Sequence, residues 1–175
     1  MNVPQVRRCG RSGDQPSGAV VGGYSLKNLT QAAVAKEIEV RMGRLRPESE
    51  RRWGKMNAHQ MVCHLADSFD LVVGGRQAAM VRTPLPRPVM KWVALQTPMR
   101  WPKGVPTLPE VEQGVGGTAP VEWRQDYQRL LETFYTFCAK QEGWPHHAIL
   151  GEMSAAEWMR WGYLHPDHHL RQFGV

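Results

Sequence analysis

The sequence predicts an all-α fold, a four-helix bundle with one long crossover loop and a short extra helix. Four segments carry apolar residues at helical spacing, and each is bounded by capping residues, Pro or Gly. No stretch shows the alternation of apolar and polar residues that marks a half-buried strand. A long Pro-rich stretch separates the second helical segment from the third. Four amphipathic helices joined in this way are typical of a helical bundle.

The first two helices are predicted over residues 29–46 and 57–73. In the first, Thr30 is the expected N-cap, and Pro47 is expected to stop the helix. In the second, Asn57 is the expected N-cap, and two consecutive glycines follow the last apolar position.

The third helix is predicted over residues 120–141, with Pro120 in its first turn. The fourth begins after Ser154, which forms a capping box with Glu157 three residues later. Between the second and third helices, the stretch from about 82 to 120 holds one short apolar segment, PVMKWVALQ. We expect this segment to form a brief helix packed on the outside of the bundle.

Length and composition indicate a soluble, cytoplasmic protein of one domain. A chain of 175 residues, 42% of them hydrophobic, is long enough to bury a core. No apolar run approaches the roughly 18 residues that a membrane-spanning helix needs, and none fits the core of a signal peptide. The three cysteines show no CxxC spacing, which argues against both a disulfide framework and a cysteine zinc site.

The net charge of +6 is concentrated in the amino-terminal third. Residues 1–60 hold 11 Lys and Arg against 5 Asp and Glu, whereas residues 61–175 hold 11 against 11. This distribution argues against nucleic-acid binding, which usually places a basic stripe along a folded face. Residues 1–24 are rich in Gly, Pro, Ser and Arg, and we expect a disordered extension before a domain over residues 25–175.

Three histidines lie within five positions of the closing segment YLHPDHHLRQFG. His165 and His169 are four residues apart, so on a helix their rings share one face. That face continues backward to Trp161 and is also the core face, and His64 likewise lies among apolar positions of the second helix. Helical bundles build metal sites from side chains on facing helices, and three neutral nitrogen ligands leave a position open for water or substrate.

The spacing alone leaves other interpretations open, because an HxxxH pair also occurs as satisfied core or surface histidines. Pro166 disfavours helical geometry at the residue before it, so the helix either kinks there or ends and restarts. If the register shifts, His168 is the natural substitute ligand. Asp67, one turn after His64, is a candidate acceptor for an imidazole N–H, whereas His59 is expected to face elsewhere.

Two stretches, AHQMVCHLADSF and WGYLHPDHHLRQFG, together resemble the DinB-like (YfiT-like) superfamily of metal-dependent proteins. More narrowly, the chain is similar to a bacterial branch that ends in HxDHHLRQFG, and HHAILG stands where that branch has HPFFG, with His147 at its histidine. The resemblance covers residues 25–175. It implies an up-down-down-up four-helix bundle that holds a divalent metal ion through His64, His165 and His169. Zinc or nickel suits such imidazole ligands.

Superfamily members with assigned activities are thiol transferases and isomerases that use small thiols such as mycothiol, bacillithiol or glutathione. The resemblance therefore implies a metal-dependent transfer of a low-molecular-weight thiol to an electrophilic small molecule, in stress or detoxification chemistry. Arg100 and Lys103 are candidates for contact with an anionic substrate. The alternative is a non-enzymatic helical module with a structural metal, or one that binds a small ligand or a partner chain. Exposed helix faces would also allow a homodimer.

Overall fold

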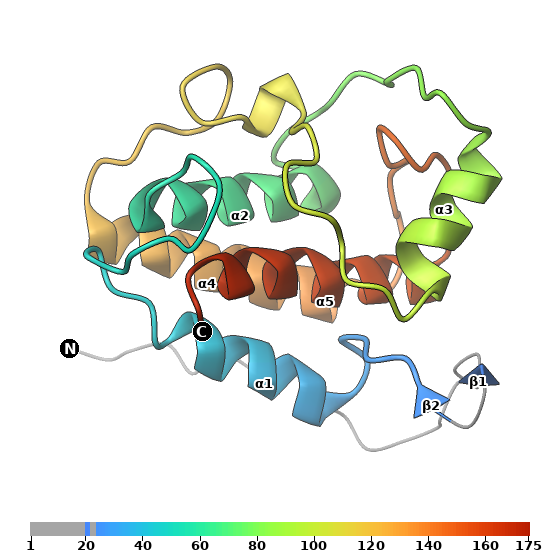
Figure 1. Cartoon of the computed structure of the whole chain (residues 1–175), viewed down its shortest axis with the longest axis horizontal. Coiled ribbons are helices and arrows are strands. Elements are labelled where there is room, and N and C mark those ends of the chain that lie inside the picture. The colour runs from blue at the N-terminus through green and yellow to red at the C-terminus, as the bar shows by residue number, and fades with distance from the viewer. Residues whose placement is uncertain (1–19, 22–23) are drawn as a thin grey trace.

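The computed structural model describes residues 20–21 and 24–175, and this part of the chain is all-α apart from two very short strands (Figure 1). The strands β1 (Val20–Val21) and β2 (Tyr24–Ser25) pair antiparallel. The α-helices are α1 (Ala32–Met42), α2 (Ala58–Val73), α3 (Arg87–Gln96), α4 (Trp123–Ala139) and α5 (Ala155–Gln172), with a 3-10 helix η1 at Pro109–Val111. The predicted all-α class is confirmed, and the up-down-down-up order stays a prediction. Most of the expected disordered extension, residues 1–24, lies outside the described residues.

The long helices α1, α2, α4 and α5 contribute to one hydrophobic core. Helix α2 packs along α4, while α1 and α3 pack against α5 (Figure 1). Aromatic rings fill the centre: Phe69 of α2 lies 5.7 Å from Phe134 and 6.1 Å from Trp161, measured between ring centroids. Burial of large side chains of this kind is the main stabilising contribution to the fold. In the described part of the chain, no helix combines the length and the apolar character needed to cross a bilayer.

The two helices that carry the predicted histidine ligands begin where the sequence predicts. At α2, the Asn57 side chain accepts from the Gln60 backbone N–H at 2.8 Å, and the Gln60 side chain accepts from the Asn57 N–H at 2.9 Å. At α5, Ser154 and Glu157 form the same reciprocal pair. Both capping boxes are therefore confirmed.

Two other predicted boundaries are wrong. The Thr30 hydroxyl donates to the Asn28 side chain instead of capping a helix, and α1 begins only at Ala32 and ends at Met42. Pro120 lies before α4 and not in its first turn. The N-cap of α4 is Glu122, whose carboxylate accepts from two backbone N–H groups of that turn. In both cases a nearby side chain offers the backbone a different hydrogen bond from the expected one.

Helix α5 runs without interruption through Pro166, so of the two alternatives for this residue the structure rules out an end and restart of the helix. Proline removes the N–H that would bond to the carbonyl of Gly162, four residues earlier. The backbone at Gly162 packs so closely against the ring of Phe137 on α4 that a Cβ there would overlap the ring. We infer that this packing offsets the lost hydrogen bond and keeps the helix continuous. His165 and His169 therefore stay one turn apart on the same helix.

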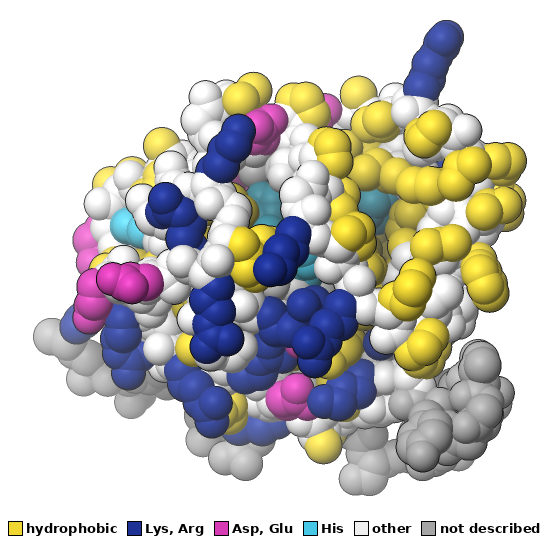
Figure 2. Space-filling model, viewed as in Figure 1, with side chains coloured by type: hydrophobic (Ala, Val, Ile, Leu, Met, Phe, Trp, Pro, Cys, Tyr) yellow, Lys and Arg dark blue, Asp and Glu magenta, His cyan; other side chains and the backbone are white. Residues whose placement is uncertain are grey.

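The crossover between α2 and α4 contains the predicted short extra helix, α3. It is fixed to α5 by the Lys91–Glu157 ion pair at 3.1 Å and by a hydrogen bond from Arg160 Nε to the Leu95 carbonyl at 3.0 Å. The outer face of α3 is apolar, and the Trp92 side chain is 61% exposed there. Figure 2 shows hydrophobic side chains gathered on the side of the molecule where Figure 1 places α3.

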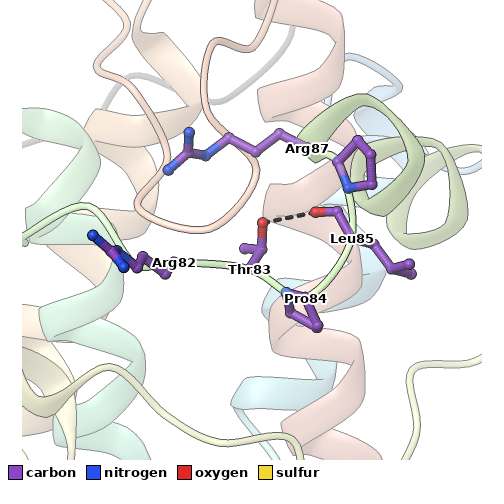
Figure 3. Close-up of a pocket in the computed structure, with 6 residues that line it drawn as sticks. Arg82, Thr83, Pro84, Leu85 and Arg87 are labelled. Carbon is purple, nitrogen blue, oxygen red and sulfur yellow. Dashed lines mark hydrogen bonds between the residues drawn. The ribbon is translucent and has the colours of Figure 1, made fainter.

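An open hollow lies in the crossover just before α3 (Figure 3). Its lining comes from one short stretch of chain, residues 82–87. The Thr83 hydroxyl donates to the Leu85 carbonyl at 2.8 Å within this stretch. None of the predicted histidine ligands lines the hollow, so the hollow is not part of the candidate metal site.

Candidate metal centre

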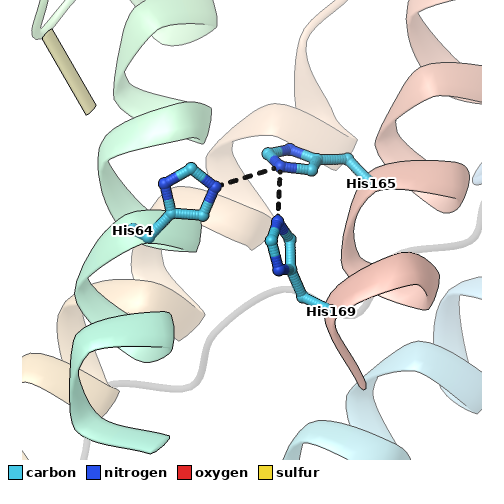
Figure 4. A group of neighbouring side chains, drawn as sticks. All are labelled: His64, His165 and His169. Carbon is cyan, nitrogen blue, oxygen red and sulfur yellow. Dashed lines mark hydrogen bonds between the residues drawn. The ribbon is translucent and has the colours of Figure 1, made fainter. Parts of the chain in front are cut away.

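His64 of α2 meets His165 and His169 of α5 in the interior between the two helices (Figure 4). The Nε2 atom of His165 lies 3.3 Å from Nε2 of His64 and 3.1 Å from Nε2 of His169. His64 and His169 are buried and His165 is partly buried. The structure thus brings together the three residues predicted as ligands, in a cluster that could hold a metal ion. We call these three residues the histidine triad.

The spacing of the nitrogens fits a transition metal. With metal–nitrogen bonds of about 2.0–2.1 Å, two ligands of a tetrahedral ion lie about 3.3–3.4 Å apart, and neighbouring ligands of an octahedral ion about 2.9 Å apart. The two nitrogen separations in the triad, 3.3 and 3.1 Å, fall at or between these values.

Hydrogen bonds at the outer nitrogens fix how two of the rings present themselves. His64 Nδ1 lies 2.9 Å from the Val111 carbonyl, and His169 Nδ1 lies 3.1 Å from Gln172 Oε1. The Gln172 amide is oriented by its own NH₂ group, which donates to the Trp53 carbonyl at 2.8 Å. Both acceptors are carbonyl oxygens, so each Nδ1 carries the hydrogen and each Nε2 presents a lone pair to the centre.

His165 is held differently. Its Nδ1 is buried and has no hydrogen-bond partner among the described residues. The ring instead packs beside Trp161 at 4.9 Å and Trp101 at 6.1 Å between centroids. At most one hydrogen can lie between the three inner nitrogens, on His165 itself, and a cation bound by all three lone pairs would require that hydrogen on His165 Nδ1 instead.

Burial keeps the triad neutral. Loss of hydration lowers the pKa of His64, against the opposing effect of its hydrogen bond to Val111. Burial also holds the pKa values of His165 and His169 well below the ordinary range, and the neighbouring imidazoles lower them further. Neutral imidazoles are the form that binds metal, so at pH 7 no proton has to leave before binding. The triad contains no carboxylate, and a bound dication would keep its full positive charge.

His168 lies beside the triad and not in it. Its ring packs edge-on to Trp53 at 4.8 Å and lies 6.2 Å from Trp101, measured between centroids. Burial lowers the pKa of His168 to about 4. The group of ligand atoms close enough to share one ion contains His165 and His169, as predicted, without the proposed substitute.

Asp67, the candidate acceptor for an imidazole N–H, has other hydrogen-bond partners. Its buried carboxylate accepts from the backbone N–H and the hydroxyl of Thr118, both at 2.7 Å, and from Arg129 at 2.8 Å. The residues that orient the imidazoles are Val111, through its carbonyl, and Gln172. Neither role was predicted from the sequence. Every residue has a backbone carbonyl, so nothing in the sequence marks Val111. Gln172 could have been identified only from its position, three residues after His169 on the same helix.

His59, expected to face away from the triad, forms a separate cluster. Its Nε2 lies 2.7 Å from Asp126 Oδ2, and the same carboxylate accepts from the Val121 backbone N–H at 2.9 Å and from the Cys63 thiol. Burial acts to raise the pKa of Asp126, but these hydrogen bonds together outweigh it and lower that pKa. His59, Cys63 and Asp126 are also close enough to share a metal ion.

Aromatic and basic side chains lie near one side of the triad. Lys103 sits over the Trp53 ring, with its Nζ 5.7 Å from the centroid, and Trp53 in turn contacts His168. Arg100, the other predicted substrate contact, is exposed. Figure 2 shows histidine side chains visible on a face that also carries several Lys and Arg side chains.

Comparison with known proteins places the chain in a family without assigning it an activity. A comparison with curated proteins gave no match, and neither did a comparison with solved structures. The family model described as "Protein of unknown function (DUF1569)" matches residues 25–174, which include the helices that carry the triad. Because this match spans most of the 175 residues, the chain belongs to the DUF1569 family.

Proposed function

We propose that this protein binds one divalent metal ion, zinc or nickel, through His64, His165 and His169, in a DinB-like bundle of up-down-down-up order. The observation that supports the proposal most strongly is the arrangement of hydrogens on the imidazoles. His64 and His169 each use Nδ1–H for a carbonyl acceptor and direct the Nε2 lone pair inward. Ligating histidines in metalloproteins are held in this way, with the second nitrogen fixed by a nearby acceptor.

The activity that we propose is transfer of a low-molecular-weight thiol to an electrophilic small molecule. A divalent ion at the triad would supply the positive charge that lowers the pKa of a coordinated thiol or water. The rings of Trp101 and Trp161 beside His165 would shield the reacting groups from bulk water. Lys103, over the Trp53 ring, would attract the carboxylates that small cellular thiols carry.

Neither of the two cysteines in the described part of the chain is suited to supply the thiol. Burial raises the pKa of Cys63 to about 12, and both this residue and Cys138 are inaccessible. A thiol with such a pKa is almost entirely protonated at pH 7 and is a poor nucleophile. Cys63, whose thiol donates to Asp126, and the buried Cys138 therefore have structural roles in the core.

A second candidate function is a non-enzymatic module in which the metal is structural. The triad joins α2 to α5, and these two helices pack mainly against α4 and α1 respectively. A metal ion between them would cross-link the two halves of the core and stabilise the fold directly.

The first experiment is metal analysis by mass spectrometry on untagged protein prepared without chelators. We expect about one zinc or nickel ion per chain in the wild type and in His168→Ala, and none in His169→Ala. His168→Ala is the matched control because it removes the neighbouring imidazole on the same helix. A wild type that stays metal-free after loading with zinc and with nickel would contradict the proposal.

Calorimetric titration with glutathione then separates the two candidate functions. The transferase predicts that metal-loaded wild type binds the thiol and that His169→Ala does not. It also predicts consumption of free thiol in the presence of chlorodinitrobenzene. A metal that raises the melting temperature while no thiol binds would support the structural module instead.

A further inference from the structure

The loop before α5 holds a fourth histidine, His147, in a fixed tautomer. The backbones of His147 and Gly151 exchange two hydrogen bonds, both at 2.8 Å, which close a tight turn. Inside this turn, Nδ1 of His147 accepts from the backbone N–H groups of Ile149 at 3.1 Å and Leu150 at 3.2 Å. Amide N–H groups only donate, so Nδ1 has no hydrogen and the neutral ring carries its hydrogen on Nε2.

This tautomer is the opposite of the one found in the triad. His64 and His169 carry hydrogen on Nδ1 and present a lone pair, as metal ligands do. His147 presents an N–H and cannot ligate through Nε2 while the turn is intact. Burial lowers its pKa to about 4, which is consistent with a ring that stays neutral at pH 7.

His147 shares a packing partner with the triad, and its N–H is not used by the described part of the fold. His147 and His165 pack against the same indole, that of Trp161, with centroid distances of 5.9 and 4.9 Å. His147 is partly exposed, and its Nε2 has no hydrogen-bond partner among residues 20–21 and 24–175. The described part of the chain therefore leaves an oriented, unpaired donor on a ring that packs against Trp161, as His165 does.

We propose that His147 Nε2–H is a donor subsite for an oxygen atom of the molecule that binds at the triad. The ligand class that fits is a small compound with a hydrogen-bond-accepting oxygen, such as a carbonyl, epoxide or carboxylate oxygen, placed to extend from the triad across Trp161. A fixed donor recognises such an oxygen because no freedom of the ring is lost on binding. The inference rests on the proposed function, since the triad has to hold the metal to which the ligand binds.

Two substitutions separate the donor from the turn. His147→Asn places an amide oxygen near the position of Nδ1, where it can still accept from the Ile149 and Leu150 N–H groups, but it has no group in place of Nε2–H. His147→Gln extends an amide NH₂ toward the position of Nε2 and restores a donor. The probe is acetohydroxamate, a small chelator of zinc with oxygen acceptors, titrated calorimetrically into the zinc-loaded full chain.

We expect His147→Asn to keep one zinc ion per chain and the wild-type melting temperature while its affinity for acetohydroxamate falls about tenfold, the effect of one lost hydrogen bond. His147→Gln should recover most of that affinity. Unchanged affinity in a zinc-loaded His147→Asn would overturn this inference and leave the metal site intact. A wild type without zinc would overturn the metal site and this inference together, and the metal content distinguishes the two results.

A direct measurement covers the case in which the variants fold poorly. Proton–nitrogen correlation spectra of the wild-type histidine side chains report which ring nitrogen carries the hydrogen. We expect the Nε2–H form for His147 and the Nδ1–H form for His64 and His169. An Nδ1–H form of His147 would overturn the inference without any variant.

Discussion

Helix α2 contributes one histidine to each of two clusters, and the two clusters differ in how their hydrogens are placed. His59 donates its Nε2–H to Asp126, whose carboxylate also accepts from the Val121 amide. His64 has its only hydrogen on Nδ1, where the Val111 carbonyl accepts it, and its Nε2 faces two further imidazoles. Both clusters are compact enough for a metal ion, so compactness does not distinguish them.

The two clusters differ in whether their hydrogen-bond donors and acceptors are all paired. Around Asp126, each donor has an acceptor, and the buried carboxylate is compensated by three hydrogen bonds. In the triad, two lone pairs point at a third imidazole that can offer one hydrogen at most. A buried acceptor without a donor is costly, and a cation is the group that satisfies several lone pairs at once. The count of donors and acceptors therefore favours the triad over the His59 cluster as the proposed metal site.

The largest expected effect separates the two clusters directly. His64→Ala removes one of three ligands and should lower the affinity for zinc by more than about a hundredfold, because the two remaining nitrogens bind weakly on their own. His59→Ala, the matched change on the same helix, should leave the affinity unchanged. Competition with a chromophoric zinc chelator measures both affinities. Equal losses in the two variants would contradict the proposal that the triad, and not the His59 cluster, binds the metal.

The pH dependence of stability tests the neutrality of the buried histidines in chelator-treated protein. Burial lowers the pKa values of His64, His165 and His169, and those of His147 and His168 to about 4. Below the unperturbed pKa of about 6.5, the unfolded chain binds protons that the folded protein does not, so stability falls as the pH falls.

Each histidine that stays neutral should remove about 1 kcal/mol of unfolding free energy between pH 7.5 and 5.5. Urea titrations at several pH values measure this slope. His168→Asn removes one such histidine, so the loss of unfolding free energy between pH 7.5 and 5.5 should be about 1 kcal/mol smaller in this variant than in the wild type. An unfolding free energy that is constant over this range would show that the buried imidazoles are already protonated or exposed.

Much of the fold could be predicted because its signals are local. The capping boxes at Asn57 and Ser154 lie within one turn of chain, and the sequence shows both partners of each. The helix end that Pro166 left open does not occur, because tertiary packing overrides the local preference through the close approach of Gly162 to Phe137. Propensity decides a helix end only where packing does not.

The residues of the triad could be predicted, but their supporting contacts could not. His165 and His169 are linked by helical spacing, and a resemblance connects them to His64 on another helix. The acceptor for His64, the Val111 carbonyl, comes from η1, which is 47 residues away in the chain and has no side-chain signal. The tautomer of His147 depends in the same way on a turn geometry that only the structure shows.

A smaller effect is expected where a triad hydrogen bond is removed and the ligands stay. Gln172→Leu deprives His169 Nδ1–H of its acceptor and should lower the affinity for zinc about 10- to 100-fold. Gln128→Leu on the exposed face of α4 is the matched control and should bind zinc like the wild type. Chelator competition again measures the affinity. If Gln172→Leu binds zinc normally, packing alone orients His169.

The smallest expected effect falls on the cluster around His59 and concerns stability alone. Asp126→Asn keeps the shape of the side chain but removes the charge that compensates His59, Cys63 and the Val121 amide. Since hydrogen bonds to a charged group are worth more than neutral ones, we expect the unfolding free energy to fall by about 1–2 kcal/mol. Zinc content should remain that of the wild type, because no atom of this cluster contacts the triad's inner nitrogens.

The exposed change Glu132→Gln is the control for loss of a carboxylate on the same helix. Loss of zinc in Asp126→Asn with little change in stability would show that this cluster, and not the triad, binds the metal.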